Sequence, residues 1–493
     1  MSTLYRRIAD HYLAALQDGT LAVGARFPSV RRLMRDHEVS LSTALQVCRH
    51  LEDLGWLQAR PRSGYFVQRP RRASLAPARE MPAEPSEADY VGIHARLSAI
   101  LARGEARGSR LNLALAVCPP ELYPTAVLSR TAQQLLRRHP ELLTSTSRRH
   151  GHPALKAALA RRALDRGIHA RADEIVVTHG CIEALNLALR AVTQPGDTVA
   201  VESPTFYGML QNLEALGLRA LEIPTSPRTG LSVDALEFAL QRDAEQGGRL
   251  RAVLAMPTVH NPLGCVMPDS EKERLVRLCE HHDIALIEDD TYADMMAPGI
   301  QAYAAKSWCR SGHVIYCQSL NKNLAPGLRV GWTLAGRWQA RVEMLKYTQT
   351  RFNEDLPQMT LASFLSSPAW DRHRQQMREV LARRRNDYLE GIARHFPAGT
   401  RVSPPAGGLL LWIELPDGVH GDDLFDAALE AGIKISPGSM SSNGRRFDHF
   451  VRLAIGTPYG PAVDEALKWL GHCARAKARR GSAQALALCS DAA

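Results

Sequence analysis

The chain has 493 residues, of which 45% are apolar and 23% charged, and it carries a formal net charge of +10. This length predicts two or three domains, and the composition is that of a globular protein. No apolar run approaches the roughly 18 residues of a membrane span, and the first residues lack the apolar stretch of a signal peptide, so we expect a cytoplasmic protein.

The cysteines and the distribution of charge along the chain indicate the compartment and the kind of partner. The nine cysteines are scattered and form no C-x-x-C pair, which predicts a reducing compartment and neither a zinc site nor a disulfide framework. Residues 1–72 hold 12 arginines, no lysine and six acidic residues, and so carry +6 of the net charge. A basic N-terminal module ahead of a nearly neutral body is typical of nucleic-acid binding, although a solvated basic face would have the same composition.

The first seventy residues have the pattern of three short helices and a hairpin. Apolar residues at helical spacing predict a first helix from Leu4 to near Gly19. Ser29 and Ser40 are suited to cap a second and a third helix. Residues 56–59 and 65–67 read as two short strands around a turn. This order predicts a winged helix-turn-helix over residues 1–69, with its third helix in the major groove of DNA.

Polar and basic residues around the third helix and the hairpin are the candidates for contact with double-stranded DNA. Those that begin the third helix would face base edges, and the arginines would hold phosphates. These candidates are Arg31, Arg32, Ser40, Leu41, Ser42, Thr43, Arg60, Arg62, Ser63 and Gly64. A small helical domain without a DNA role is the alternative.

The stretch P-S-V-R-R-L, followed by V-S-L-S-T and by L-E-D-L-G-W-L-Q-A-R-P-R-S-G-Y-F-V, resembles the DNA-binding domain of the GntR family. The spacing of Pro28, the capping Ser40, Gly55 and the Ser63-Gly64 wing agrees with that family. Leu41 stands where the family usually has arginine, which removes a bidentate reader of guanine from this position.

Two segments differ in character from the rest of the chain. Residues 70–110 contain prolines at 70, 77, 82 and 85 among alanine, arginine and glutamate, which predicts a semi-extended linker with no catalytic role. A short amphipathic helix is expected within it, over residues 91–101. Residues 473–493 carry several basic residues and are expected to form a poorly ordered tail.

Apolar runs alternate with helical segments over residues 111–472. The runs at 174–178, 198–201, 252–256 and 284–288 are almost wholly apolar, as expected for the strands of a mostly parallel sheet covered on both faces. Ligands of such sheets bind at the carboxyl ends of the strands. The residues that follow each run are therefore candidate site residues.

Each run is followed by a short motif with two interpretations. Gly180, Cys181 and Ile182 start a helix whose N–H groups would bind an anion, or form a plain strand–helix turn. Phe206 follows the second run, where an aromatic residue of the core is the plain interpretation. Asn261 follows the third run in H-N-P-L-G, a sequence that is also common in ordinary turns. Asp289, with Tyr292 three residues later, supplies a carboxylate at a strand end, where it would otherwise cap a helix.

Residues 316–332 read Y-C-Q-S-L-N-K-N-L-A-P-G-L-R-V-G-W. Ser319 and Arg329 would cradle a phosphate, and Lys322 would condense with an aldehyde, which together indicate pyridoxal 5'-phosphate (PLP). A surface lysine with basic neighbours is the alternative. Arg452 lies alone in an apolar run, where it would bind a carboxylate or make a structural salt bridge.

These motifs, in this order, resemble the fold-type I PLP enzymes of the aspartate aminotransferase family, an α/β fold with a small C-terminal α/β subdomain. The resemblance implies that Lys322 holds PLP as an internal aldimine and that Phe206 stacks on the pyridine ring. It also implies that Asp289 pairs with the ring nitrogen and that Tyr292 and Asn261 bond the phenolic oxygen. Lys322, Asp289 and Tyr292 would be catalytic, and Arg452 would hold an effector or substrate carboxylate. Thr146 stands where family members often have a tyrosine that reaches the partner subunit's phosphate.

The order of the two modules resembles the MocR subfamily of GntR transcription regulators. That resemblance implies a homodimeric regulator that senses an amino acid or amine through aldimine exchange at Lys322. The alternative is a catalytically active PLP aminotransferase with an auxiliary DNA-binding domain. A DNA-binding protein whose body is only a dimerisation scaffold is a third interpretation.

Overall fold

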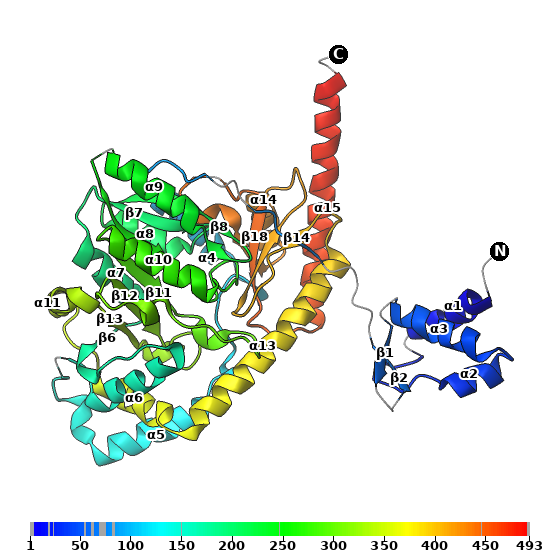
Figure 1. Ribbon diagram of the computed structural model, residues 1–493, viewed down its shortest axis with the longest axis horizontal. Helices are drawn as coiled ribbons and strands as arrows, with labels where there is room; N and C mark the ends of the chain where they lie inside the picture. Colours follow the sequence, from blue (N-terminus) through cyan, green and yellow to red (C-terminus); the bar gives the residue numbers. More distant parts are fainter. Residues whose placement is uncertain are drawn as a thin grey trace. The chain divides into compact units, whose positions relative to one another are not determined.

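The computed structural model divides the chain into two compact units, Met1–Ser74 and Leu75–Ala493 (Figure 1). It describes residues 4–17, 20–22, 24–53, 56–60, 64–68, 75–80, 84–148, 150–245, 247–444 and 446–490. Of the DNA-contact candidates, Arg62 and Ser63 lie outside these residues, and the side chain of Arg60 is not among those described.

The N-terminal unit has the helices and the hairpin that the sequence predicts. Its elements are α1 (Leu4–Gln17), α2 (Val30–Asp36), α3 (Leu41–Asp53), β1 (Leu57–Arg60) and β2 (Gly64–Val67). Strands β1 and β2 pair antiparallel, and a shared core of residues such as Ile8, Leu33, Val47 and Leu57 joins them to the helices. Ser29 accepts a hydrogen bond from the backbone N–H of Arg32, and Ser40 from that of Thr43, so both serines cap their helices.

The larger unit is built on a nine-stranded sheet in the order β4-β8-β7-β10-β11-β12-β13-β6, with β9 paired to β8. Strands β8, β7, β10, β11 and β12 pair parallel along this order, and β13 joins β12 and β6 antiparallel. The strands are β4 (Asp89–Tyr90), β6 (Ile175–Thr178), β7 (Thr198–Ser203), β8 (Arg219–Ser226), β9 (Gly230–Leu231), β10 (Leu250–Ala255), β11 (Ala285–Asp289), β12 (Val314–Ser319) and β13 (Gly331–Leu334).

Helices cover both faces of this sheet, as the apolar runs predict (Figure 1). Along β10, Ala252 and Leu254 pack into one core with α7, whereas Val253 and Ala255 pack into another with α9 and α10. This alternation follows the two-residue period of a strand. The helices here are α4 (His94–Ala106), α5 (Thr125–Arg138), α6 (Pro153–Ala163), α7 (Cys181–Val192), α8 (Tyr207–Ala215), α9 (Val233–Glu245), α10 (Asp269–His281), α11 (Gln339–Gln349) and α12 (Asp355–Leu365).

A second, five-stranded sheet in the order β17-β18-β15-β14-β3 forms the smaller subdomain of this unit. Helix α13 (Pro368–His395) connects the part of the unit that holds the nine-stranded sheet to the smaller subdomain (Figure 1). The remaining elements are β3 (Ala76–Pro77), β5 (Leu111–Asn112), β14 (Arg401–Val402), β15 (Leu410–Glu414), α14 (Gly421–Glu430), β16 (Ile433–Lys434), β17 (Ser436–Pro437), β18 (Phe450–Ala454) and α15 (Pro461–Ser490).

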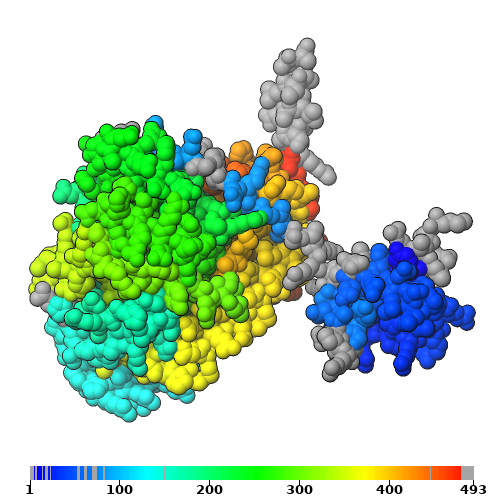
Figure 2. All heavy atoms as spheres, viewed as in Figure 1, coloured from blue at the N-terminus to red at the C-terminus, as the bar shows by residue number. Residues whose placement is uncertain are grey.

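The expected linker is the main difference from the sequence analysis. From Leu75 onward the chain belongs to the larger unit, because β3 adds to the five-stranded sheet, β4 adds to the nine-stranded sheet, and Leu97 and Ile100 of α4 are buried. Figure 2 shows light-blue atoms of this segment against the green and orange surface of the unit. The expected boundary at residue 110 was therefore wrong. Likewise, α15 extends to Ser490, through most of the expected tail.

Among the helices of the described ranges, none is long and apolar enough to cross a membrane.

Candidate functional site

The predicted site residues of the body meet at one cavity of about 190 Å³. Residues that follow β6, β7, β10, β11 and β12 line it from the carboxyl ends of those strands, and β18 of the smaller sheet closes it. The predicted residues in its lining are Cys181, Ile182, Phe206, Asn261, Asp289, Tyr292, Ser319, Lys322, Arg329 and Arg452. Gly180 immediately precedes this lining.

The loop between β6 and α7 forms a candidate anion cradle at one end of the cavity. Gly180 has a φ of +84°, and a Cβ placed there would lie 2.7 Å from Asn321 Nδ2 and 3.3 Å from Arg329 Nη2. Gly331 of β13 packs against the backbone of Gly180, where a Cβ would come within 2.5 Å. Two side-chain donors therefore converge beside the free N–H groups that begin α7, which is the chemistry that a phosphate requires.

Glu183, in the first turn of α7, holds this loop from behind. Its Oε2 accepts from the backbone N–H of His179 at 2.6 Å and pairs with Lys346 Nζ at 3.2 Å. Burial opposes the charge on this carboxylate, but hydrogen bonds from His179 and Thr350 hold its pKa at about 2. The loop that would bind phosphate is thus tied to α11.

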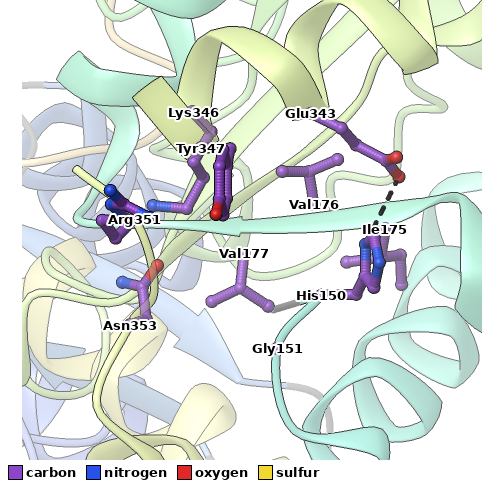
Figure 3. A pocket seen from close by; sticks show the side chains of 10 residues that line it. All are labelled: His150, Gly151, Ile175, Val176, Val177, Glu343, Lys346, Tyr347, Arg351 and Asn353. Atoms are coloured by element: carbon purple, nitrogen blue, oxygen red, sulfur yellow. Dashed lines mark ion pairs between the residues drawn. The ribbon is translucent and has the colours of Figure 1, made fainter. Parts of the chain in front are cut away.

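A small cavity lies next to this support, between His150, Val177, Glu343 and Lys346 (Figure 3). Figure 3 shows the ion pair between His150 and Glu343, which are 3.9 Å apart. At about 20 Å³ the cavity has room for a water molecule but not for a cofactor. The larger cavity is therefore the candidate site.

Asp289 is a buried carboxylate at the end of β11. Its Oδ1 accepts hydrogen bonds from Thr291 Oγ1 at 2.5 Å, from the Thr291 N–H at 3.0 Å and from Cys181 Sγ at 3.4 Å. Burial raises the pKa of Asp289 despite these donors. A cationic ring nitrogen in the cavity would offset the free-energy cost of burying the charged carboxylate, and so would favour its ionised form.

Lys322 faces the same cavity from the turn after β12. Its Nζ donates to the carbonyl of Ala116 at 3.0 Å. Burial, followed by the positive charge of Arg452, lowers the pKa of Lys322 to about 8. An appreciable share of this lysine is therefore an uncharged amine near neutral pH, which is the form that condenses with an aldehyde.

Arg452 lies on β18, opposite Trp412 of β15, and is buried. Its Nη2 donates to the carbonyl of Ala114 at 2.9 Å and to Ser436 Oγ at 3.1 Å, while Nη1 lies 3.4 Å from Asn261 Oδ1. Its Nε is buried and without a hydrogen-bond partner in the described part of the chain. None of these bonds is to a carboxylate, so the guanidinium is suited to receive an anionic ligand.

The cavity therefore has the groups that PLP requires: an anion cradle at Gly180, a carboxylate at Asp289, an amine at Lys322 and an aromatic ring at Phe206. The ring of Phe206 fits where it does because residue 208 is glycine, whose Cβ would lie 2.5 Å from that ring. The residues present fit the cofactor that the resemblance implies.

Several residues of the lining were not among the predicted ones. They are Ala114, Leu115, Ala116, Tyr207, Met256, Thr291 and Asn321. Tyr207 and Thr291 adjoin predicted residues, so inspection of motif neighbours would have found them. Ala114, Leu115 and Ala116 follow a two-residue strand and belong to no pattern that marks a site.

The helix that would read DNA begins with a cluster of hydroxyl groups. Ser40 Oγ lies 2.9 Å from Ser42 Oγ and 3.0 Å from Thr43 Oγ1, so Ser40 serves as a cap and also orders the first turn. Leu41 is 54% exposed. Gln46 and Arg49 extend the exposed face of α3 and were not predicted, although their spacing from Ser42 is helical.

The arginines of α2 and of the wing differ in their surroundings. Arg31 and Arg32 are both exposed, and Arg32 Nε pairs with Asp36 Oδ2 at 3.0 Å. Arg26, also exposed, approaches Gly64 of the wing, where a Cβ would lie 3.7 Å from its guanidinium. Arg26 is therefore a further DNA-contact candidate that the sequence analysis missed.

Comparison with known proteins gives two family matches. Residues 4–67 match the gntR family of bacterial regulatory proteins, and residues 121–460 match the class I and II aminotransferases. The chain is 33% identical to the uncharacterized HTH-type transcriptional regulator YjiR of Escherichia coli, and 34% identical to its uncharacterized HTH-type regulator YdcR. Each alignment covers 95% of this chain and 98% of the relative.

Among solved structures, the larger unit is similar to LysN, the α-aminoadipate aminotransferase of Thermus thermophilus, in complex with N-(5'-phosphopyridoxyl)-L-leucine. The TM-score is 0.68 at 25% identity, and the match covers 77% of this chain and 98% of that one.

Proposed function

Because the chain belongs to the MocR group, in which a gntR-family head precedes a class I and II aminotransferase domain, we propose that it is a cytoplasmic, PLP-dependent transcription regulator. It would bind operator DNA through the N-terminal unit and sense an amino acid or amine in the cavity of the larger unit. One observation supports this most strongly: a lysine, a carboxylate, an anion cradle and a buried arginine line a single cavity.

The cofactor of this family is PLP, which when bound supplies an aldehyde that captures amines and a ring that accepts electrons. The cradle of Gly180, Asn321 and Arg329 would hold its phosphate, and Phe206 would stack on its ring. Asp289 would hold a proton on the ring nitrogen, and Asn261 and Tyr292 would bond the phenolic oxygen. These roles rest on the positions of the residues in the cavity and on the family motifs.

Arg452 and Lys322 would set the orientation of an amino acid in the cavity. The guanidinium of Arg452 would bind the α-carboxylate, because its Nε has no hydrogen-bond partner in the described structure and its present acceptors are neutral. Lys322 would accept or release a proton at Nζ, which its lowered pKa permits near neutral pH.

The chain that leaves the DNA-binding unit is anchored in the sheet that carries Arg452. Ala76 of β3 pairs with Arg401 of β14, and the sheet continues through β15 to β18. The same segment then crosses to the larger sheet, where Asp89 of β4 pairs with Ala220 of β8. We infer that the smaller subdomain closes on a ligand and that this closure shifts the segment. The ligand can then change DNA affinity only to the extent that it binds the open and the closed state with different affinities.

A homodimer would complete the arrangement and present two DNA-binding heads. Ile182 and Met344 are exposed apolar residues on α7 and α11, two helices that contact each other, and Ile182 also lines the cavity. A second copy that covers this surface would bury both residues. Thr146, exposed and without an aromatic ring, would not supply the phosphate contact that the family's tyrosine makes.

The second candidate function is amino transfer. It is favoured by the lowered pKa of Lys322, since an uncharged amine beside the ligand is what proton transfer at the ligand's α-carbon requires. Incubation of the PLP-loaded protein with an amino donor decides between the two functions. Turnover predicts a keto acid in amounts that exceed the protein, whereas a regulator without turnover gives none.

The proposed function is tested by the absorbance spectrum and DNA affinity of the purified protein and of Lys322→Ala. We expect the wild type to show a visible band of bound cofactor, which the variant lacks, and a DNA affinity that changes with an amino acid ligand. Absence of the band after incubation with PLP would overturn the cofactor assignment.

A further inference from the structure

One short segment connects the two groups that would hold an amino acid. The carbonyl of Ala114 accepts from Arg452 Nη2 at 2.9 Å, and the carbonyl of Ala116 accepts from Lys322 Nζ at 3.0 Å. Leu115 lies between these carbonyls, lines the cavity and is 56% exposed.

The backbone of this segment is fixed from both sides. Asn112 Oδ1 accepts from the N–H groups of Ala114 at 3.0 Å and Leu115 at 3.1 Å. At the other end, Tyr123 OH accepts from the Cys118 N–H at 3.0 Å and lies 3.4 Å from the carbonyl of Lys322. The backbone around Leu115 is therefore held by Asn112 and Tyr123 as well as by the bonds from Arg452 and Lys322.

An α-amino acid with its carboxylate on Arg452 and its amino group beside Lys322 would place its α-carbon between these groups. We propose that Leu115 contacts the effector's side chain and selects an α-amino acid whose side chain is apolar. This proposal rests on the proposed function, because it assumes that the cavity binds PLP and an amino acid.

The rest of the lining supports the same ligand class. Its charged side chains in the described structure are Asp289, Lys322, Arg329 and Arg452, and each has a role in holding the cofactor or the carboxylate. The remaining large side chains are Leu115, Ile182, Phe206, Tyr207, Met256 and Tyr292, none of which is charged. A charged ligand side chain would lose its hydration here without gaining an ionic partner, whereas an apolar one would gain from leaving water.

The test is calorimetric titration of the PLP-loaded protein with leucine, glutamate and lysine, which reads binding directly. The wild type is expected to bind leucine at least about tenfold more tightly than glutamate or lysine. Leu115→Ala should weaken leucine binding about tenfold, and Leu115→Arg should reverse the preference toward glutamate. Leu164→Ala, which removes a similarly exposed leucine outside this cavity, should change nothing.

The outcomes separate this inference from the proposed function. Tighter binding of glutamate or lysine than of leucine by the wild type would overturn the ligand class. An unchanged ranking in both Leu115 variants would overturn the role of that residue. In either case the visible absorbance band of the bound cofactor and the proposed sensing function would be unaffected. If the band is present and no amino acid or amine binds, the sensing proposal fails together with this inference.

Discussion

Arg79 and Glu414 join the chain that leaves the DNA-binding unit to the sheet that carries the candidate effector arginine. The Arg79 N–H donates to Glu414 Oε2 at 2.8 Å, and its guanidinium pairs with Oε1 of the same carboxylate. The side chain of Glu414 is fully buried, whereas that of Arg79 is 51% exposed. Removal of the arginine would leave a buried carboxylate without its cation, which is costly.

Replacement of Arg79 by alanine should therefore loosen this segment and uncouple the two units. In the wild type, an effector is expected to change DNA affinity by about 5–150-fold, the usual range of allosteric coupling. Arg79→Ala should bring that factor close to one while the cofactor band and effector affinity persist. Fluorescence anisotropy with labelled DNA measures this change.

Arg107→Ala is the matched control for this variant. Arg107 is a similarly exposed arginine of the larger unit, 3.8 Å from Glu430, and takes no part in the pairing of β3. The Arg107→Ala variant should retain the wild-type coupling between effector binding and DNA affinity. Equal coupling in Arg79→Ala and in the wild type would contradict the role given to the segment.

Capture of PLP by cofactor-free protein should depend on pH through Lys322. Burial and the charge of Arg452 lower the pKa of this lysine to about 8, and only the uncharged amine reacts. The rate should therefore rise as pH increases through about 8 and level off above it. Stopped-flow absorbance gives the profile.

Arg452→Gln removes the positive charge that helps to lower the pKa of Lys322, and therefore tests this cause of the lowered pKa. Without the nearby positive charge, the protonated lysine is less destabilised, so the profile should move to higher pH. The same variant should lose most of its affinity for amino acids but still bind simple amines. A profile that moves to lower pH, or carboxylate binding that is undiminished, would be inconsistent with the assigned role.

Glu183→Gln should destabilise the larger unit at neutral pH. The pKa of Glu183 falls from 4.5 to about 2 on folding, which corresponds to ~3 kcal/mol of stability. Because the folded-state pKa is the lower one, this contribution is present above about 4.5 and is lost as pH falls toward 2. Urea unfolding at pH 7 and at lower pH measures both effects.

Glu343→Gln provides the comparison. The side chain of Glu343 is 29% exposed and lies 3.9 Å from His150. Loss of its charge should therefore lower the free energy of unfolding by less than about 1 kcal/mol. If the two variants were equally stable at pH 7, the support assigned to Glu183 would be wrong.

The two neighbouring arginines of α2 should contribute unequally to DNA binding. Arg32 pairs with Asp36, which partly neutralises it, whereas Arg31 is exposed on the same helix. Arg31→Ala should weaken binding to all sequences and reduce the slope of log affinity against log salt by about 1. Arg32→Ala should have the smaller effect, and the reverse order would exclude this arrangement of phosphate contacts.

Much of the candidate site was predictable because its residues follow long apolar strands. Asp289 ends β11 and Lys322 follows β12, and parallel strands bring such residues to one edge of a sheet. The segment from Ala114 to Ala116 has no such signal, because its position depends on hydrogen bonds to Arg452 and Lys322, far along the chain.

The misplaced linker has a similar cause. Strands β3 and β4 have two residues each, too few for a periodic pattern, and prolines in this region indicate a tether. Pairing with β14 and β8, more than a hundred residues away in sequence, decides their structure. Local propensity does not contain that information.

A ligand at Lys322 is expected to control DNA binding. The most direct test is the affinity of the PLP-loaded protein for a DNA fragment that the wild type selects from random sequence, measured with and without an amino acid ligand and compared with Lys322→Ala. We predict that the ligand changes wild-type affinity at least about fivefold, and that the variant binds DNA but does not respond. A variant that responds as the wild type does, or a wild type that responds to no amino acid or amine, would exclude control of DNA binding through Lys322.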